Sequence, residues 1–145
     1  MTPKLPRSIL VVIHAGDAEV LLLERADRPG FWQSVTGSLE LGETALAAAI
    51  REVKEETGLQ PTAETLVDCR LSNRFEIFPQ WRHRYATGVE HNLEHVFSLR
   101  LPHASPITLS DEHLGYRWLP WRQAAAKCFS WSNRDAIFVL GDAHP

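Results

Sequence analysis

The stretch from Thr44 to Thr57 limits the possible folds of this chain more than any other, because it predicts a helix with both ends marked. Thr44 is a favourable N-cap residue, and strong helix formers follow it. Gly58 stands where a helix commonly ends in a left-handed residue. At about 100° per residue, one face gathers four apolar side chains, those of Leu46, Ala49, Ile50 and Val53. A face of this kind has to pack on a sheet.

Extended segments are predicted on both sides of this helix. They are Ser8–Ala15, Val20–Glu24, a short piece Trp32–Thr36, Leu66–Phe78, Leu93–Leu101 and Tyr116–Leu119. The first two are expected to form a hairpin through a turn at residues 15–18. A closing helix is predicted over Ser132–Leu140. Strands on both sides of a central helix, with another helix last, indicate an α+β or α/β sandwich.

The composition favours a single domain over residues 1–145 and argues against several functional classes. The net charge of −3 gives no positive field for nucleic acid. The apolar run Ile9–Ile13 is too short to span a membrane. Cys69 and Cys128 form no CxxC pair, so we expect neither a disulfide framework nor a structural zinc site. A reducing cytoplasm is the expected location.

Three glutamates on the predicted helix point to metal chemistry. Glu52 and Glu56 lie roughly 40° apart beside the apolar face, and Glu55 lies further round. Like charges at this spacing repel by a few tenths of a kcal/mol per pair, roughly, and a hard divalent cation relieves that repulsion. The alternative is a solvated acidic face in which Arg51 pairs with Glu55 at i, i+4.

The spacing around these glutamates follows a wider pattern, from Gly37 to Leu59. Glycine is followed after five residues by glutamate, and after seven more by Arg-Glu-apolar-any-Glu-Glu-any-Gly-apolar. This pattern resembles the Nudix box, and every fixed position of the box is filled. The strand order around residues 37–59 is also similar to that of a Nudix domain.

The resemblance implies a fold, a cofactor and roles for the box residues. The implied fold is an α/β/α sandwich whose mixed sheet carries the box helix on one face and the C-terminal helix on the other. Nudix hydrolases hold Mg²⁺, or Mn²⁺, against the phosphates of a small phosphorylated substrate. Glu52 and Glu56 match the principal metal ligands, and Glu55 a ligand or water-orienting residue. The remaining matches brace or shape the loop and helix: Gly37, Glu43, Arg51 and Gly58.

Several stretches outside the box resemble one branch of the family, the dihydroneopterin triphosphate pyrophosphatases of bacterial folate synthesis. These stretches are residues 31–37, 75–78, 82–85, 112–114 and 130–134. A pterin is flat and rich in hydrogen-bonding groups, so its site needs apolar walls and a few polar side chains. The candidates for contact with the pterin are Trp32, Thr36, Phe75, Glu76, Ile77, Phe78 and Ser130.

Lys4 and Arg25 are the candidates for contact with the triphosphate. For each substrate candidate, ordinary packing or surface charge is an equally good explanation. Three tryptophans are assigned to the core instead: Trp118, Trp121 and Trp131.

A carboxylate outside the box often completes a Nudix site, and the resemblance favours Glu112 as an added ligand or base. Asp111 and Glu76 compete with it, and an exposed acidic turn is the remaining alternative. His91 and His95 are four residues apart in or beside a predicted strand, so they should not share a helical face. We interpret both histidines as structural or surface residues.

Two other functions stay open. A general (deoxy)nucleoside triphosphate pyrophosphatase would use the same box and metal with a different base pocket. A non-catalytic Nudix module that senses nucleotides would be expected to have lost box glutamates, and none is lost here. The oligomeric state does not follow from the sequence.

Overall fold

The computed structural model describes residues 2–16 and 19–142, and within them seven strands form one mixed sheet. The strands are β1 (Arg7–Ala15), β2 (Glu19–Arg25), β3 (Trp32–Gln33), β4 (Val35–Ser38), β5 (Leu66–Glu76), β6 (His91–Leu101) and β7 (His113–Pro120). The helices are α1 (Ala45–Thr57), α2 (Trp121–Lys127) and α3 (Trp131–Asp142), with a 3₁₀ segment η1 (Pro79–Arg84). The main strand order is β3-β2-β1-β6-β5, and the short β4 and long β7 pair with β1 and β2.

Strand β1 is the centre of the sheet and explains where the chain opens into a pocket. Along its whole length β1 runs parallel to β6, from Arg7 opposite Leu93 to Ala15 opposite Leu101. Its other edge is divided, because residues 8–11 pair with β4 while only residues 14–15 pair with β2. Strands β2 and β4 therefore separate from each other beside β1.

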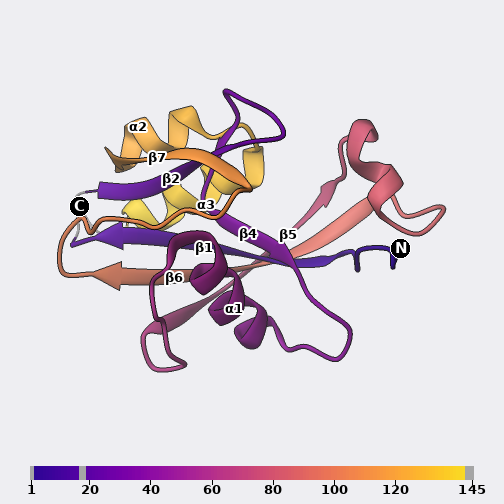
Figure 1. Ribbon diagram of the computed structural model, residues 1–145, viewed down its shortest axis with the longest axis horizontal. Coiled ribbons are helices and arrows are strands. Elements are labelled where there is room, and N and C mark those ends of the chain that lie inside the picture. The colour runs from indigo at the N-terminus through magenta and orange to yellow at the C-terminus, as the bar shows by residue number, and fades with distance from the viewer. Residues whose placement is uncertain (1, 17–18, 143–145) are drawn as a thin grey trace.

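Helices cover both faces of the sheet, which confirms the predicted sandwich (Figure 1). Alternate residues of β1 point to opposite faces. Ile9, Val11 and Ile13 pack in the core beneath α1, whereas Leu10 and Val12 pack beneath α2 and α3. The apolar run at residues 9–13 is continuous because both faces of this strand are buried.

Helix α1 begins and ends as the sequence predicts. The Thr44 side chain accepts a hydrogen bond from the Ala47 amide at 3.1 Å. Gly58 is left-handed, with φ of 75°. Val53 is fully buried against the sheet, as expected for the apolar face. Leu46 and Ile50 are only partly buried, because Glu52 and Glu56 take up part of the buried surface.

The structure differs from the predicted elements at several places. The piece Trp32–Thr36 is divided at Ser34 into β3 and β4. Helix α2 and segment η1 were not predicted. Helix α2 directly follows β7 with no loop between them, so its start carries no clear sequence signal. Residues 17 and 18 of the predicted turn lie outside the described residues.

The two cysteines are not bonded to each other in the structure. Cys69 and Cys128 are both free, and burial raises the pKa of the Cys128 thiol to about 12. In residues 2–16 and 19–142, no helix is both long enough and apolar enough to cross a bilayer.

Candidate active site

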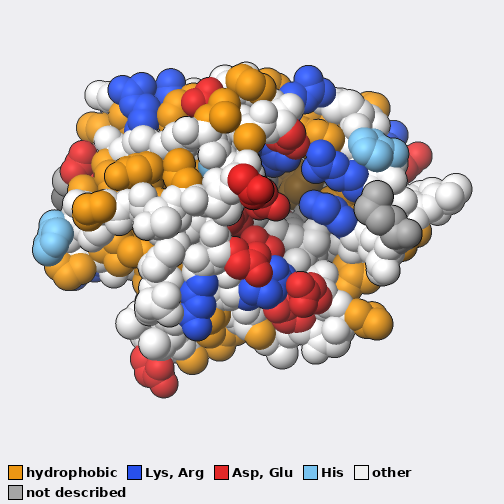
Figure 2. Space-filling view, viewed as in Figure 1, with side chains coloured by type: hydrophobic (Ala, Val, Ile, Leu, Met, Phe, Trp, Pro, Cys, Tyr) orange, Lys and Arg blue, Asp and Glu red, His pale blue; other side chains and the backbone are white. Residues whose placement is uncertain are grey.

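A deep pocket of about 1470 Å³ opens where β2 and β4 separate. This volume exceeds the roughly 300–1,000 Å³ usual for small-molecule pockets, so an elongated ligand can fit. Figure 2 shows acidic side chains on one side of the hollow and basic side chains on the other. Of the nine residues predicted for substrate contact, all but Trp32 line the pocket: Lys4, Arg25, Thr36, Phe75, Glu76, Ile77, Phe78 and Ser130.

Arg51 fastens the loop before α1 to the helix. Its Nε and Nη2 donate to the two carboxylate oxygens of Glu43 at 2.9 Å, and Nη2 also donates to the Ser38 carbonyl at 3.1 Å. The hydrogen bonds from Arg51 lower the pKa of Glu43. Its Nη1 donates to Glu52 at 2.7 Å and lies 3.5 Å from the Glu55 carboxylate. The geometry agrees with bracing roles for Glu43 and Arg51.

Gly37 allows α1 to lie directly on β4. A Cβ at this position would overlap the carboxyl group of Glu52. The side chain of Glu52 therefore packs on the backbone of β4. A larger residue at position 37 would displace Glu52 from the wall of the pocket.

Glu56 is a buried carboxyl group to which no described residue donates a hydrogen bond at ordinary geometry. It is 1% exposed, and its oxygens approach the Thr36 backbone and the Glu52 carboxyl group. Burial raises its pKa well above the ordinary value, and the nearby carboxylates of Glu52 and Glu112 act in the same direction. The His113 Nε2 lies 3.6 Å from Glu56, but burial lowers the pKa of this histidine and favours its neutral form.

The carboxylate oxygens around Glu56 are of the kind that binds a hard divalent cation, although they do not converge on one point in this structure. Among the described residues, no three acidic, histidine or cysteine side chains converge as metal ligands. The Glu55 side chain is 57% exposed, and Glu52 is engaged by Arg51. Two buried, unpartnered carboxylate oxygens beside a second carboxylate are nevertheless what Mg²⁺ or Mn²⁺ coordination uses.

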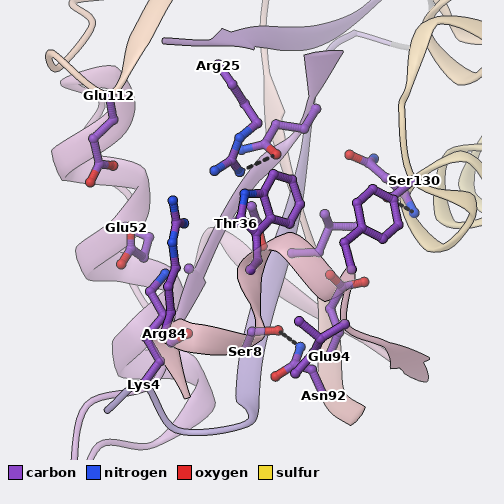
Figure 3. Close-up of a pocket in the computed structure, with 18 of the residues that line it drawn as sticks. Lys4, Ser8, Arg25, Thr36, Glu52, Arg84, Asn92, Glu94, Glu112 and Ser130 are labelled. Carbon is purple, nitrogen blue, oxygen red and sulfur yellow. Dashed lines mark hydrogen bonds between the residues drawn. The ribbon is translucent and has the colours of Figure 1, made fainter. Parts of the chain in front are cut away.

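Of the three candidates for an extra carboxylate, Glu112 lies nearest the box glutamates. Its charge acts on Glu55, Glu56 and Lys4, and Figure 3 shows it facing the pocket above Glu52. Asp111 also lines the pocket. Glu76 accepts a hydrogen bond from Arg82 at 2.6 Å, so its carboxylate is already engaged.

Three cations gather beside the carboxylates. Lys4 lies close enough to Arg84 and Arg25 that, after burial, their charges are the main causes that lower its pKa. The Lys4 amide donates to the Arg84 carbonyl at 2.8 Å, so the backbone itself holds the two together. Arg25 donates to Asp27 at 2.7 Å and to Gln33 at 3.1 Å. Arg84 is a site residue that the sequence reasoning did not single out.

Aromatic rings form another wall. Phe78 stacks on Trp81 with centroids 5.3 Å apart, and Phe129 meets both rings edge-on. Trp81 and Phe129 were not predicted; each comes from a segment without clear periodicity. The prediction for Trp32 as a wall is wrong, because it packs into the core near α2 instead.

The tryptophans assigned to the core divide into two groups. Trp118 and Trp121 pack against the core as expected. Trp131 is 45% exposed and lines the pocket, so its assignment to the core is wrong. It is the first residue of α3 and so lies at the end of the helix rather than on its buried face.

The two predicted hydroxyl groups are already used within the protein. Thr36 donates to the Ile9 carbonyl at 2.9 Å, and Ser130 accepts from the Asn133 amide at 3.3 Å. Both line the pocket. Each hydroxyl has a second hydrogen-bonding capacity that a ligand can use.

A buried polar group at the far side of the pocket was missed by the sequence reasoning. Ser8, Asn92 and Glu94 are all less than 9% exposed and line the pocket. The sequence pattern of β6 pointed the other way, because in the structure the apolar Leu93 is exposed while its polar neighbours Asn92 and Glu94 are buried, the reverse of ordinary alternation. His91 and His95 on the same strand are partly buried and lie outside the pocket lining.

The fold, the box geometry and the acidic wall formed by Glu52, Glu55, Glu56 and Glu112 define a family. A NUDIX domain model matches residues 4–140, and the chain belongs to this family. A solved Ap4A hydrolase from Caenorhabditis elegans shares the fold, with a TM-score of 0.67 at 23% identity over 94% of this chain and 95% of that one.

More similar relatives point to one particular enzyme. The chain is 56% identical to dihydroneopterin triphosphate diphosphatase of Escherichia coli strain K12, over 97% of this chain and 96% of that protein. The enzyme of the same name from Haemophilus influenzae is 41% identical, over 90% and 84% of the two chains. The solved structure of the E. coli dihydroneopterin triphosphate pyrophosphohydrolase matches with a TM-score of 0.93 and 53% identity, covering 99% of both chains.

Proposed function

We propose that this protein is a Nudix hydrolase that converts dihydroneopterin triphosphate to dihydroneopterin monophosphate and pyrophosphate. The observation that carries this proposal is the 56% identity to an enzyme of that name along nearly the whole of both chains. The reaction belongs to folate synthesis, and a cytoplasmic location agrees with the free cysteines.

Glu52 and Glu56 would hold the Mg²⁺ or Mn²⁺ ion, with Glu55 and Glu112 as further ligands. When bound, the metal polarises phosphoryl oxygens and lowers the pKa of a coordinated water. Gly37 and Arg51 keep Glu52 at the edge of the pocket, while burial keeps Glu56 in place. Glu52 and Glu56 are thus held in place, whereas Glu55 and Glu112 would have to move toward them to complete the metal site.

Glu55 and Glu112 would orient the attacking water and accept its proton. Burial and the neighbouring Glu52 raise the pKa of Glu55, which makes its carboxylate a stronger base. Lys4, Arg25 and Arg84 would hold the phosphate tail and neutralise the charge on the leaving pyrophosphate. The ring would lie toward Phe78 and the other aromatic residues.

The substrate is tested by ranking kcat/KM for dihydroneopterin triphosphate against the eight common nucleoside triphosphates in Mg²⁺. Dihydroneopterin triphosphate should rank first. A nucleotide ranking above it would instead support a general nucleoside triphosphate pyrophosphatase, which needs the same acidic wall.

The scissile bond is tested by an early time course without added pyrophosphatase. Cleavage of the α–β anhydride should release pyrophosphate in equal amount with the monophosphate. Orthophosphate together with a diphosphate intermediate would contradict the proposed orientation of the triphosphate over the acidic wall.

A further inference from the structure

The pocket contains a second set of carboxyl and amide groups, separate from the box. Figure 3 shows Ser8, Asn92 and Glu94 on the side opposite Glu52 and Glu112. Asn92 Nδ2 donates to Ser8 Oγ at 2.6 Å. The side-chain carbonyl oxygen of Asn92 takes no part in this hydrogen bond. Glu94 is 4% exposed and belongs to β6, beside Ser8 of β1 in the sheet. We name Ser8, Asn92 and Glu94 the polar floor.

Two acceptors of the polar floor have no donor. No described residue donates to Glu94 Oε1 or to Asn92 Oδ1, although both atoms are buried. A buried acceptor without a partner is destabilising, so native proteins rarely keep one without a use. Asn92 and Glu94 both line the pocket, so a ligand that brings N–H groups can supply the missing hydrogen-bond donors.

The rest of the structure holds Glu94 in this position. Its side chain makes a hydrogen bond with Ser132, at the start of α3. Asn133 fixes that helix start, because its Oδ1 accepts from the Ser34 amide at 2.8 Å and its Nδ2 donates to Ser34 Oγ at 3.0 Å. Burial raises the pKa of Glu94 to about 7, so the carboxyl group is only partly ionised at neutral pH.

We propose that Glu94, with Asn92, determines specificity by accepting hydrogen bonds from two adjacent N–H donors on the ligand ring. The inference rests on the proposed function and names the part of the substrate that is read. In a pterin these donors are the N3–H and the 2-amino group, and guanine offers the same pair as N1–H and 2-amino. Adenine and cytosine place an acceptor beside their amino group, and thymine has no amino group.

The position of the polar floor suits this role. The phosphates belong beside Glu52 and the cations Lys4 and Arg84, which lie on the opposite side of the pocket in Figure 3. The aromatic wall with Phe78 and Phe129 supplies apolar surface for a flat ring. A ring attached to a triphosphate can therefore reach Glu94 while its phosphates lie over the box.

The test compares GTP with ITP, which lacks only the 2-amino group, and measures kcat/KM for both in Mg²⁺. The wild-type protein should prefer GTP by about 10- to 100-fold, the usual range for a lost hydrogen bond to a charged acceptor. Glu94→Gln presents a donor where an acceptor is needed, so the preference should fall to near one. Its kcat/KM for dihydroneopterin triphosphate should fall about 10- to 100-fold through KM.

The controls separate this inference from the proposed function. Glu64→Gln makes the same change at an exposed glutamate outside the pocket and should keep the wild-type preference. Glu94→Asp keeps a carboxylate and should retain a preference for GTP, with a raised KM. Equal use of GTP and ITP by the wild type, or a full preference in a folded Glu94→Gln, overturns the role of Glu94. If the wild type does not hydrolyse dihydroneopterin triphosphate, the proposed substrate is wrong instead. The comparison of GTP with ITP in the wild type does not depend on any variant folding.

Discussion

At the scale of single residues, two carboxyl groups are buried although their charged forms are more stable in water. Among the described residues, Glu56 has no hydrogen-bond donor at ordinary geometry, and Glu94 has one partner, the Ser132 side chain. Their neighbours differ in kind. Glu56 faces other carboxylates, which suits a cation, whereas Glu94 faces an amide and a hydroxyl, which suit a neutral ring. The surroundings thus suit the carboxyl group of Glu56 for binding a cation and that of Glu94 for accepting hydrogen bonds.

Removing the charge of a metal ligand should abolish activity without unfolding the protein. Glu52→Gln and Glu56→Gln preserve size, so circular dichroism should be unchanged. Activity should fall at least about 100-fold, as expected when a metal ligand is lost. Near-normal turnover in either variant at saturating Mg²⁺ would contradict the assignment, and Glu64→Gln serves as the control.

The choice between two neighbouring acids can be made by kinetics. Glu112→Gln should lower kcat more than it raises KM, because Glu112 lies beside the box glutamates and is proposed to act in the chemical step. Asp111→Asn should have a small effect. The opposite result would mean that Asp111 is the extra carboxylate.

Glu94 should make stability depend on pH. Its pKa is raised to about 7 in the folded state, so the folded protein binds more protons than the unfolded chain between about pH 4.5 and 7. Stability is therefore lost as pH rises through this window. Glu94→Gln should be more stable than wild type at pH 8 by about 3 kcal/mol, and most of this gain should be lost by pH 5. Urea unfolding at both pH values measures it, and an equal difference at the two pH values would show that Glu94 does not titrate as described.

At the scale of elements, α1 contributes residues both to the hydrophobic core and to the pocket. Ala49 and Val53 pack on the sheet, while Glu52 and Glu56, one turn apart, line the pocket. The helix can hold the glutamates only if both its ends are fixed. Thr44 fixes one end, and Gly58 fixes the other against Thr108.

A side chain at the end of α1 should destabilise the protein. Gly58 has φ of +75°, and a Cβ there would approach Thr108 to 3.1 Å. Gly58→Ala should lower the free energy of unfolding by about 1 to 2 kcal/mol. Gly115→Ala is the matched control, because Gly115 has open space and no left-handed backbone. If the two variants are equally stable, the left-handed end of α1 is not under strain.

At the scale of the whole molecule, the pocket gathers residues that are far apart along the chain. Lys4, Arg84 and Glu112 come from three separate segments, and β1 brings them together by pairing with β4 on one part and β2 on another. The active site is thus a property of the divided sheet. Metal binding should therefore stabilise the entire fold.

Saturating Mg²⁺ should raise the unfolding temperature. At about 100 times Kd, a ligand that binds only the folded state adds about 2.7 kcal/mol, which corresponds to about 5 to 10 °C for a chain of this size. A chelator should reverse the shift. Differential scanning calorimetry measures it, and an equal shift in Glu56→Gln would place the ion elsewhere.

The sequence alone determined the parts of this protein that depend on local spacing. Thr44 and Gly58 mark the ends of α1 through interactions within a few residues, and a helix then necessarily places Glu52 and Glu56 together. Strands predicted on both sides of this helix, with another helix last, indicated the sandwich.

Only the tertiary structure decided the residues whose roles depend on distant partners. Arg84 lies in the site because its backbone pairs with Lys4, and Trp131 lies in the pocket because α3 begins there. Glu94 is buried because β6 pairs with β1 in one register, and a shift of one residue would turn its side chain to the other face. Register and helix docking are long-range properties, so no local spacing of residues could reveal them.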